Sequence, residues 1–163
     1  MNIRIDHITK EDGDWIRATL CDRWGDVRIV TRGNVYRGDD LPGLIAWREG
    51  EPVGLLTYRL QGNECQIVTL DALIEGEGIG TALVDALREE GVASGWDRLW
   101  LVTTNDNRHA QNFWGRRGFR LTAIHAGAIE EARRLKPSIP KRGYGGIPIL
   151  DELEYEFVFS DYE

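Results

Sequence analysis

A glycine-rich turn near the middle of the chain has the make-up of a phosphate-binding loop. The segment LDALIEGEGIGT, from Leu70 to Thr81, joins an apolar strand pattern to the first turn of a helical one. There, unpaired main-chain N–H groups and the positive end of the helix dipole point to one place and can bind a phosphate without a cationic side chain. Gly76, Gly78 and Gly80 would let a bulky diphosphate approach the main chain closely, and the Thr81 hydroxyl could add a donor.

Two well-known phosphate loops do not fit this segment. The dinucleotide fingerprint lies near the start of a strand–helix–strand unit, whereas here a meander precedes the turn and the glycines lack that spacing. The P-loop requires a lysine after its last glycine, where this chain has Thr81. A purely structural turn between a strand and a helix also fits the segment taken alone. The interpretation therefore depends on the surrounding elements.

The hydrophobic pattern predicts a single mixed α/β domain over residues 1–163. We expect the N-terminal half to contain a strand at 3–8, a helix at 10–24, an extended connection at 26–40, and an antiparallel meander of strands at 44–48, 53–60 and 65–73. We expect the C-terminal half to contain helices at 81–92, 110–117 and 126–136, strands at 99–104, 119–125 and 154–159, and a Gly/Pro-rich loop at 140–148.

Composition narrows the class of protein. The formal net charge of −7 argues against non-specific nucleic-acid binding and is compatible with a cationic partner such as an amine. The chain shows neither an apolar run long enough for a bilayer nor a signal-peptide pattern, so we expect a cytoplasmic protein that does not bind membranes. Cys21 and Cys65 are expected to be reduced and buried, and neither has metal-ligand spacing, so no metal is expected.

Two blocks of the sequence together resemble the GNAT superfamily of N-acetyltransferases. The superfamily's phosphate loop reads Arg/Gln-x-x-Gly-x-Gly/Ala, and its two small positions match Gly78 and Gly80. Its second block begins with a strand, which is followed by Asn-x-x-Ala, an aromatic pair and Gly-Phe. This chain has the same series between Leu99 and Phe119. The resemblance covers residues 44–125 well and the first 40 in outline. It implies a mixed, mostly antiparallel sheet of six to seven strands flanked by helices, with a splayed strand pair that forms a cleft for CoA.

The resemblance also implies the reaction and the cofactor site. It implies direct transfer of an acetyl group from acetyl-CoA to an amine of a small molecule or peptide; a homodimer would agree with it. The diphosphate would bind the amides of the glycine turn, and the pantetheine arm would pair with the preceding strand, one amide of which would face the thioester carbonyl. The expected cofactor-binding residues are Leu70, Ala72, Gly76, Glu77, Gly78, Ile79, Gly80, Thr81, Asn107 and Trp114.

The chain departs from the family pattern at three positions. Glu75 stands where the family usually has Arg or Gln, and Glu77 stands where it often has a basic residue. We therefore expect weaker CoA binding. Trp114 stands where many relatives have a tyrosine that protonates the leaving thiolate, and an indole cannot act as an acid. These departures favour an alternative, a non-catalytic CoA-binding sensor or scaffold. Cations to offset the glutamates could come from Arg88, Arg108 or Arg116.

Several residues are candidates for moving protons. An alkyl ammonium, with a pKa of about 10.4, must lose a proton before it attacks. Some relatives use a carboxylate at the start of the strand before the loop, which corresponds to Glu64, and Asp71 lies further along the same strand. Tyr144, in the Gly-rich loop, could replace the missing tyrosine, as could His109 or water. Asp106 is more simply a turn former.

Overall fold

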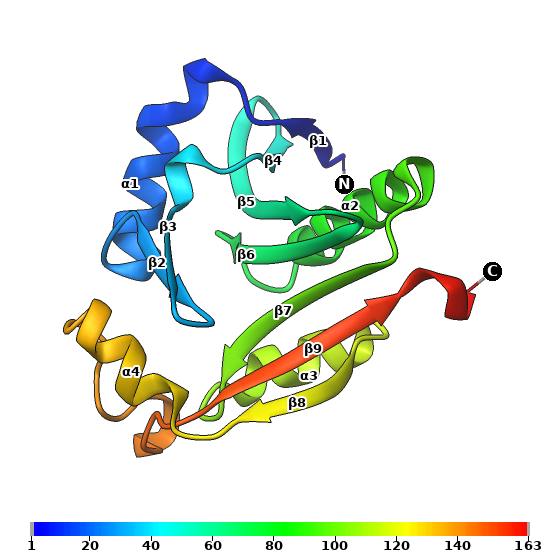
Figure 1. Ribbon diagram of the computed structural model, residues 1–163. Helices are drawn as coiled ribbons and strands as arrows, with labels where there is room; N and C mark the ends of the chain where they lie inside the picture. Colours follow the sequence, from blue (N-terminus) through cyan, green and yellow to red (C-terminus); the bar gives the residue numbers. More distant parts are fainter. Residues whose placement is uncertain (1, 163) are drawn as a thin grey trace.

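Seven strands form one mixed sheet in the computed structural model, which describes residues 2–162 (Figure 1). The strand order is β1-β4-β5-β6-β7-β9-β8, and every neighbouring pair is antiparallel except β6–β7. The strands are β1 (Arg4–His7), β4 (Gly43–Arg48), β5 (Glu51–Gln61), β6 (Glu64–Ala72), β7 (Arg98–Thr104), β8 (Arg120–His125) and β9 (Glu152–Val158). The predicted mixed, mostly antiparallel sheet is confirmed.

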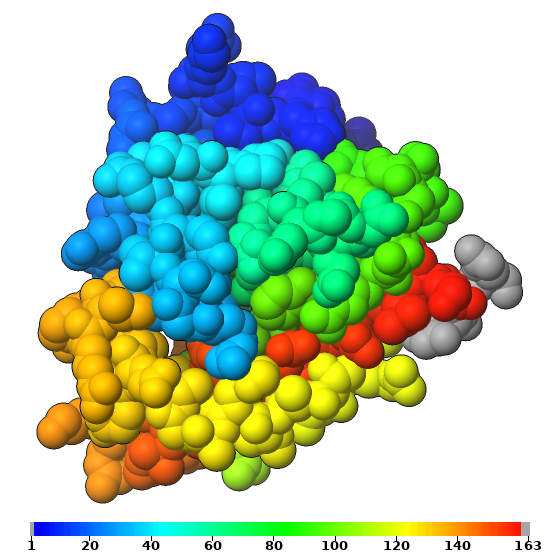
Figure 2. All heavy atoms as spheres, viewed as in Figure 1, coloured from blue at the N-terminus to red at the C-terminus, as the bar shows by residue number. Residues whose placement is uncertain are grey.

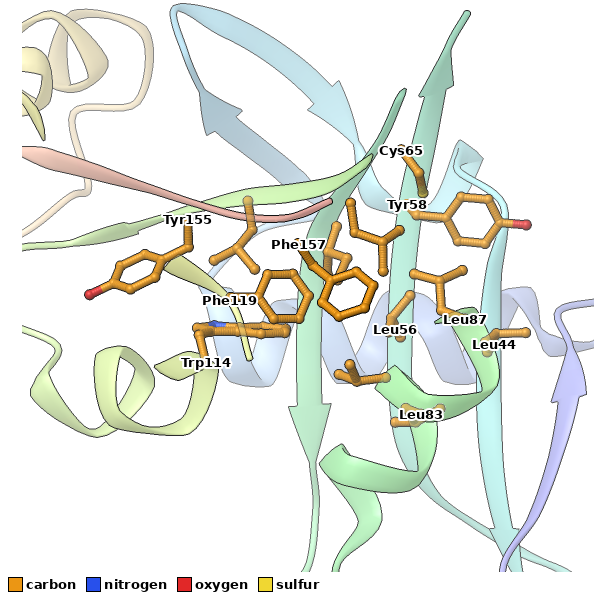
Figure 3. Packing of buried hydrophobic residues seen from close by; sticks show 14 of the residues in the cluster. Leu44, Leu56, Tyr58, Cys65, Leu83, Leu87, Trp114, Phe119, Tyr155 and Phe157 are labelled. Atoms are coloured by element: carbon orange, nitrogen blue, oxygen red, sulfur yellow. The ribbon is translucent and has the colours of Figure 1, made fainter. Parts of the chain in front are cut away.

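Helices cover both faces of this sheet (Figure 1). Leu83 and Leu87 of α2 are fully buried in the main core with Leu44 and Leu56 of the sheet, and Trp114 of α3 belongs to the same cluster (Figure 3). Within residues 2–162 the four helices are α1 (Gly13–Trp24), α2 (Ile79–Ser94), α3 (Arg108–Arg116) and α4 (Ala128–Leu135), with short 3-10 turns at Lys10–Asp12, Gly38–Asp40, Tyr144–Gly146 and Phe159–Tyr162.

The opposite face of the sheet holds a second, smaller core. Ile16 and Leu20 of α1 pack there against Ile45 and Leu55. Because successive side chains of a strand point to opposite faces, Leu44 and Ile45 serve different cores. The sheet therefore separates α1 on one side from α2 and α3 on the other.

A close contact fixes the start of α2 on the sheet. Gly54 of β5 lies under the first turn of the helix, and a Cβ atom there would be only 2.5 Å from Cγ2 of Ile79. Ile79, the first residue of α2, is accordingly 1% exposed. The missing side chain at Gly54 lets the first turn of α2 lie close against β5.

The prediction of an extended connection at 26–40 was wrong, because this segment forms a β-hairpin. β2 (Arg28–Thr31) pairs with β3 (Asn34–Arg37) through the two-residue turn Arg32-Gly33, whose φ angles are 48° and 76°. Two positive φ angles are typical of the turns that match the twist of a tight hairpin. The abundance of Gly, Arg and Asp concealed the short β-branched run of Ile29, Val30 and Thr31. Elsewhere the predicted elements differ from the structure mainly at their ends.

Both cysteines are free; Cys65 is buried, and its burial raises the pKa of the thiol to about 12, but Cys21 is exposed on α1, contrary to the prediction. In residues 2–162, no three His, Cys, Asp or Glu side chains are grouped so as to hold a metal ion. No helix in the same range has the length and apolarity needed to span a membrane.

Candidate active site

A cleft opens where β6 and β7 part. The two parallel strands pair over three residue pairs, from Glu64 with Arg98 to Gln66 with Trp100, and then diverge. Beyond the point where the two strands separate lies a cleft of about 600 Å³. Leu70 and Ala72 of β6 line it on one side, and residues of the glycine turn, α2 and α3 line most of the remainder, together with Arg23 and Tyr144. The splayed strand pair is therefore present, at the end of β6 that leads into the glycine turn.

The N-terminus of α2 forms one end of this cleft. Gly78 is the N-cap residue with φ of 75°, and among residues 2–162 no side chain caps the helix. The first main-chain bond of the helix runs from the Ala82 N–H to the Gly78 carbonyl, at 3.0 Å. The N–H groups of Ile79, Gly80 and Thr81 consequently have no partner within the helix. Since these residues line the cleft, their donors and the helix dipole could bind an anion there, and this position is called the anion site below.

Arginines from the end of α3 border the same part of the cleft. Arg116 and Arg117 both line it. Arg117 donates a hydrogen bond to the Thr81 hydroxyl, and its guanidinium carbon lies 5.4 Å from the centre of the Phe113 ring. Arg117 was not among the predicted cations. Its spacing of four residues from Phe113, which puts both on one helix face, was the available signal.

Two other predicted cations lie elsewhere. Arg88 donates to the Arg117 carbonyl at 2.6 Å and lies over the ring of Phe157, 4.8 Å from its centre. Arg108 is not among the residues that line the cleft. Arg88 therefore holds the end of α3 through the Arg117 carbonyl. Of the arginines on α3 and at its end, Arg116 and Arg117 place positive charge at the cleft.

The two loop glutamates occupy different positions. Glu75 is exposed and lines the cleft close to the start of α2. Glu77 does not line the cleft, whereas all the other predicted cofactor-binding residues do. Only Glu75 therefore places a carboxylate beside the anion site.

Asp71 is the predicted base that the fold brings into the cleft. It lies between Leu70 and Ala72, which pack against the core on the α2 side, so its side chain points to the α1 side. There the indole N–H of Trp24 donates to Asp71 Oδ2 at 2.9 Å. Burial raises the pKa of Asp71 above its usual 3.8, and the Trp24 hydrogen bond and the charge of Arg23 partly oppose this rise. A desolvated carboxylate in a cleft is a candidate proton acceptor.

Glu64, the other predicted base, lies at the end of β6 away from the cleft. It is the first residue of β6, where β6 and β7 are still paired, and its Oε1 lies 2.6 Å from Nε of Arg98. It does not line the cleft. Counting along the strand located Glu64 correctly on β6, but the strands part only after Gln66.

Tyr144 reaches the cleft from the Gly-rich loop. Its side chain is 66% exposed and lines the cleft. Its main-chain N–H donates to Oδ2 of Asp106 at 3.1 Å, and Asp106 is buried directly after β7. Gly143 lies so close to this carboxylate that a Cβ atom there would collide with it. Asp106 thus anchors the distant turn that carries Tyr144, a contact that its predicted role as a local turn former did not include.

The remaining predicted residues line the wall formed by α3. Asn107 caps this helix by accepting a hydrogen bond from the Ala110 N–H at 3.0 Å, and it lines the cleft with His109. Trp114 is 5% exposed and packs edge-on against the rings of Phe113 and Phe119. The buried indole lines the cleft at this position and has no acidic proton to give.

Comparison with known proteins agrees with this geometry. Residues 13–119 match the model of the acetyltransferase (GNAT) family. The chain is 40% identical over 138 residues to the uncharacterised protein YdhI of Bacillus subtilis, covering 84% of this chain and 86% of YdhI.

Solved structures show the same fold at low identity. An IAA acetyltransferase from Bacillus cereus superposes with a TM-score of 0.71 at 16% identity, covering 97% of this chain and all of the other. A GNAT family acetyltransferase from Elizabethkingia anophelis, solved with acetyl-CoA bound, superposes with a TM-score of 0.70 at 16% identity, covering 97% and 99%. With the family model matching most of its length, the chain belongs to the GNAT family of acetyltransferases.

Proposed function

We propose that this N-acetyltransferase moves the acetyl group of acetyl-CoA to the amine of a small molecule or peptide, with Asp71 as the proton acceptor. The observation that carries the proposal is the cleft between β6 and β7, which ends at the uncapped N-terminus of α2. The same fold in Elizabethkingia anophelis was solved with acetyl-CoA bound. We also propose a cytoplasmic location, and a homodimer stays a prediction.

The cofactor would lie along the cleft with its diphosphate at α2. The N–H groups of Ile79, Gly80 and Thr81 would bind the phosphate oxygens, and Arg116 and Arg117 would add positive charge. Beyond Gln66, β6 no longer pairs with β7, so its main-chain groups on that edge can pair with the amides of an extended pantetheine arm, as with an added strand. A strand N–H facing the thioester oxygen would stabilise the negative charge that develops there.

The reaction then needs two deprotonations of the nitrogen and one protonation of the sulfur. Asp71 would accept a proton from the ammonium, and the free amine would attack the carbonyl carbon of the thioester to give a tetrahedral intermediate whose nitrogen still carries one excess proton. Collapse of this intermediate breaks the C–S bond and releases the CoA thiolate, and the excess proton of the nitrogen passes to that thiolate through Tyr144 or water. A thiolate is a stable leaving group, since a thiol has a pKa of about 8.5. The first deprotonation, that of the ammonium, is therefore the step that most needs a protein group.

Glu75 is expected to weaken cofactor binding through charge repulsion. Glu75→Gln should tighten binding of acetyl-CoA by about two- to fivefold, since an exposed charge contributes up to about 1 kcal/mol. The gain should shrink as salt is added, because salt screens exposed charges. Titration calorimetry at low and high salt measures both effects. Glu77→Gln is the matched control, and an equal gain in that variant would contradict the assigned position of Glu75.

Tyr144 is expected to assist the departure of CoA without being essential. Tyr144→Phe removes only the hydroxyl and should lower kcat by about tenfold, less than a general acid usually contributes, because a thiolate leaves readily. The measurement is steady-state release of free thiol. Tyr36→Phe, on β3, serves as a control. An unchanged kcat in Tyr144→Phe would assign the proton to water.

A binding assay followed by a turnover assay tests the proposed function. Calorimetry with acetyl-CoA should show binding in the micromolar range common for such co-substrates. Thiol release should then appear with at least one member of a panel of polyamines, amino sugars, amino acids and peptide N-termini. Absence of binding would refute the proposal. Binding without turnover on any amine would instead support a CoA-binding sensor.

A further inference from the structure

Lys136 is a buried lysine that the proposed reaction does not use. It follows α4 directly and is 9% exposed. Its Nζ donates to the main-chain carbonyls of Trp24, at 3.1 Å, and Arg28, at 2.9 Å. Burial lowers the pKa of the Lys136 ammonium. The lysine thereby joins the end of α4 to the end of α1, two segments that lie against each other on the surface (Figure 2).

The residue that Lys136 holds is the one that contacts Asp71. Trp24 is the last residue of α1, and Gly25, with φ of 78°, ends the helix by donating its N–H to the Cys21 carbonyl at 3.0 Å. A carbonyl in the last helical turn has no partner within the helix, and here the Lys136 ammonium supplies one. The main chain of Trp24 is thus fixed on both sides. Its indole N–H then reaches across to Oδ2 of Asp71.

We propose that Trp24, held in place by Lys136, is a positioning residue that orients the Asp71 carboxylate toward the amine acceptor, an inference that rests on the proposed function. The indole N–H occupies one carboxylate oxygen, Oδ2, which leaves Oδ1 for the acceptor. A carboxylate fixed in this way loses less freedom when the reaction begins than one that can rotate. The segment after α4 would then set the activity of a residue on β6.

The alternative is that Trp24 only packs against the sheet. Its side chain is 38% exposed, so packing alone would give it a modest role. A positioning role makes a prediction that packing does not, because the Trp24 hydrogen bond lowers the pKa of Asp71. Removing this donor must therefore move the ionisation of Asp71 to higher pH. The other charged or titratable groups at this cleft are Arg23 on α1, Glu75, His109, Arg116, Arg117 and Tyr144.

Trp24→Phe tests the proposal by deleting the donor and keeping an aromatic ring. We expect kcat/KM to fall by roughly ten- to a hundredfold, as misplaced catalytic groups can cost this much. We also expect the acidic limb of its pH profile to move to higher pH. Melting temperature and acetyl-CoA affinity, measured on the same protein, show whether the fold and cofactor site are intact. Lys136→Met keeps the aliphatic part of the side chain and should shift the acidic limb of the pH profile in the same direction, by a smaller amount. If Trp24→Phe does not fold, Lys136→Met provides the test.

The double variant with Asp71→Asn separates positioning from packing. If Trp24 acts through Asp71, Trp24→Phe should cause little further loss in the Asp71→Asn background. The indole N–H resonance of Trp24 gives a readout that needs no acceptor: it should follow the ionisation of Asp71 in wild type and stop titrating in Asp71→Asn.

The outcomes distinguish this inference from the proposed function. An unmoved acidic limb, or the same fold-loss from Trp24→Phe with and without Asp71, would overturn the positioning role while leaving the proposed function standing. Full activity in Asp71→Asn would remove Asp71 as the proton acceptor, and the positioning role would fall with it.

Discussion

Asp71→Asn is expected to lower kcat/KM for the amine acceptor by about 10²–10⁴-fold, the range that a positioned base contributes. Asparagine keeps an oxygen for the Trp24 indole but cannot accept a proton. Affinity for acetyl-CoA should stay within about twofold, because the anion site at α2 is untouched. Steady-state kinetics with an acceptor identified by the amine panel, together with calorimetry, checks both expectations.

The same variant should be more stable than wild type at neutral pH. Burial raises the pKa of Asp71 in the folded state above its value in the unfolded chain. For an acid shifted in this direction, stability falls as pH rises through the window between the two pKa values, and the loss persists above it. At pH 7 the ionised carboxylate therefore costs stability that a neutral asparagine does not. A higher Tm together with lower activity is the expected pair of results.

Glu64→Gln is the matched control on the same strand. Glu64 lies at the end of β6 that is still paired with β7, and its carboxylate pairs with Arg98. The activity of the Glu64→Gln variant should therefore stay close to that of wild type. Comparable losses in Glu64→Gln and Asp71→Asn would contradict the assignment of the base to the open end of the cleft.

Gly78→Val is expected to weaken binding of acetyl-CoA by about a hundredfold or more. Gly78 has a φ of 75°, which a β-branched residue adopts only under strain, so the turn should rearrange. Rearrangement would misdirect the N–H groups at the start of α2. Each hydrogen bond to a charged group contributes about 1.5–3 kcal/mol, so losing one or two has an effect of this size. Calorimetry with acetyl-CoA and with CoA measures it.

The other end of the same helix offers a matched control. Gly95 ends α2 with φ of 72°, and a Cβ atom at either glycine would have no neighbour within 4 Å. Gly95→Val should therefore introduce similar strain without changing the anion site. If both variants lose cofactor affinity equally, the loss reflects destabilised α2 and the N-terminal site is not supported.

Local patterns explain most of what could be predicted about the fold. The glycine turn and the start of α2 are encoded within a dozen consecutive residues, so periodicity and turn chemistry located them. The antiparallel meander followed from alternating runs joined by short turns. The hairpin of β2 and β3 was missed because its strands are four residues each, too short for alternation to stand out among charged residues.

Long-range contacts explain what could not be predicted about the site. Asp71 and Trp24 are 47 residues apart, and nothing in either local sequence indicates that they meet. Lys136 ends a charged helical segment, and nothing in the local sequence indicates that it is buried against α1. Glu64 was considered because it lies on the right strand, but the point where β6 and β7 separate is a tertiary property. Arg117 was detectable only from its helical spacing to Phe113.

A crystal structure of the protein with CoA tests the central claim most directly. The predicted result places the diphosphate within hydrogen-bond distance of the N–H groups of Ile79, Gly80 and Thr81, with the pantetheine arm between β6 and β7. CoA bound elsewhere, for example in the groove between α2 and β9 that includes Val92 and Phe159, would contradict the account. So would a cleft that stays empty at millimolar CoA.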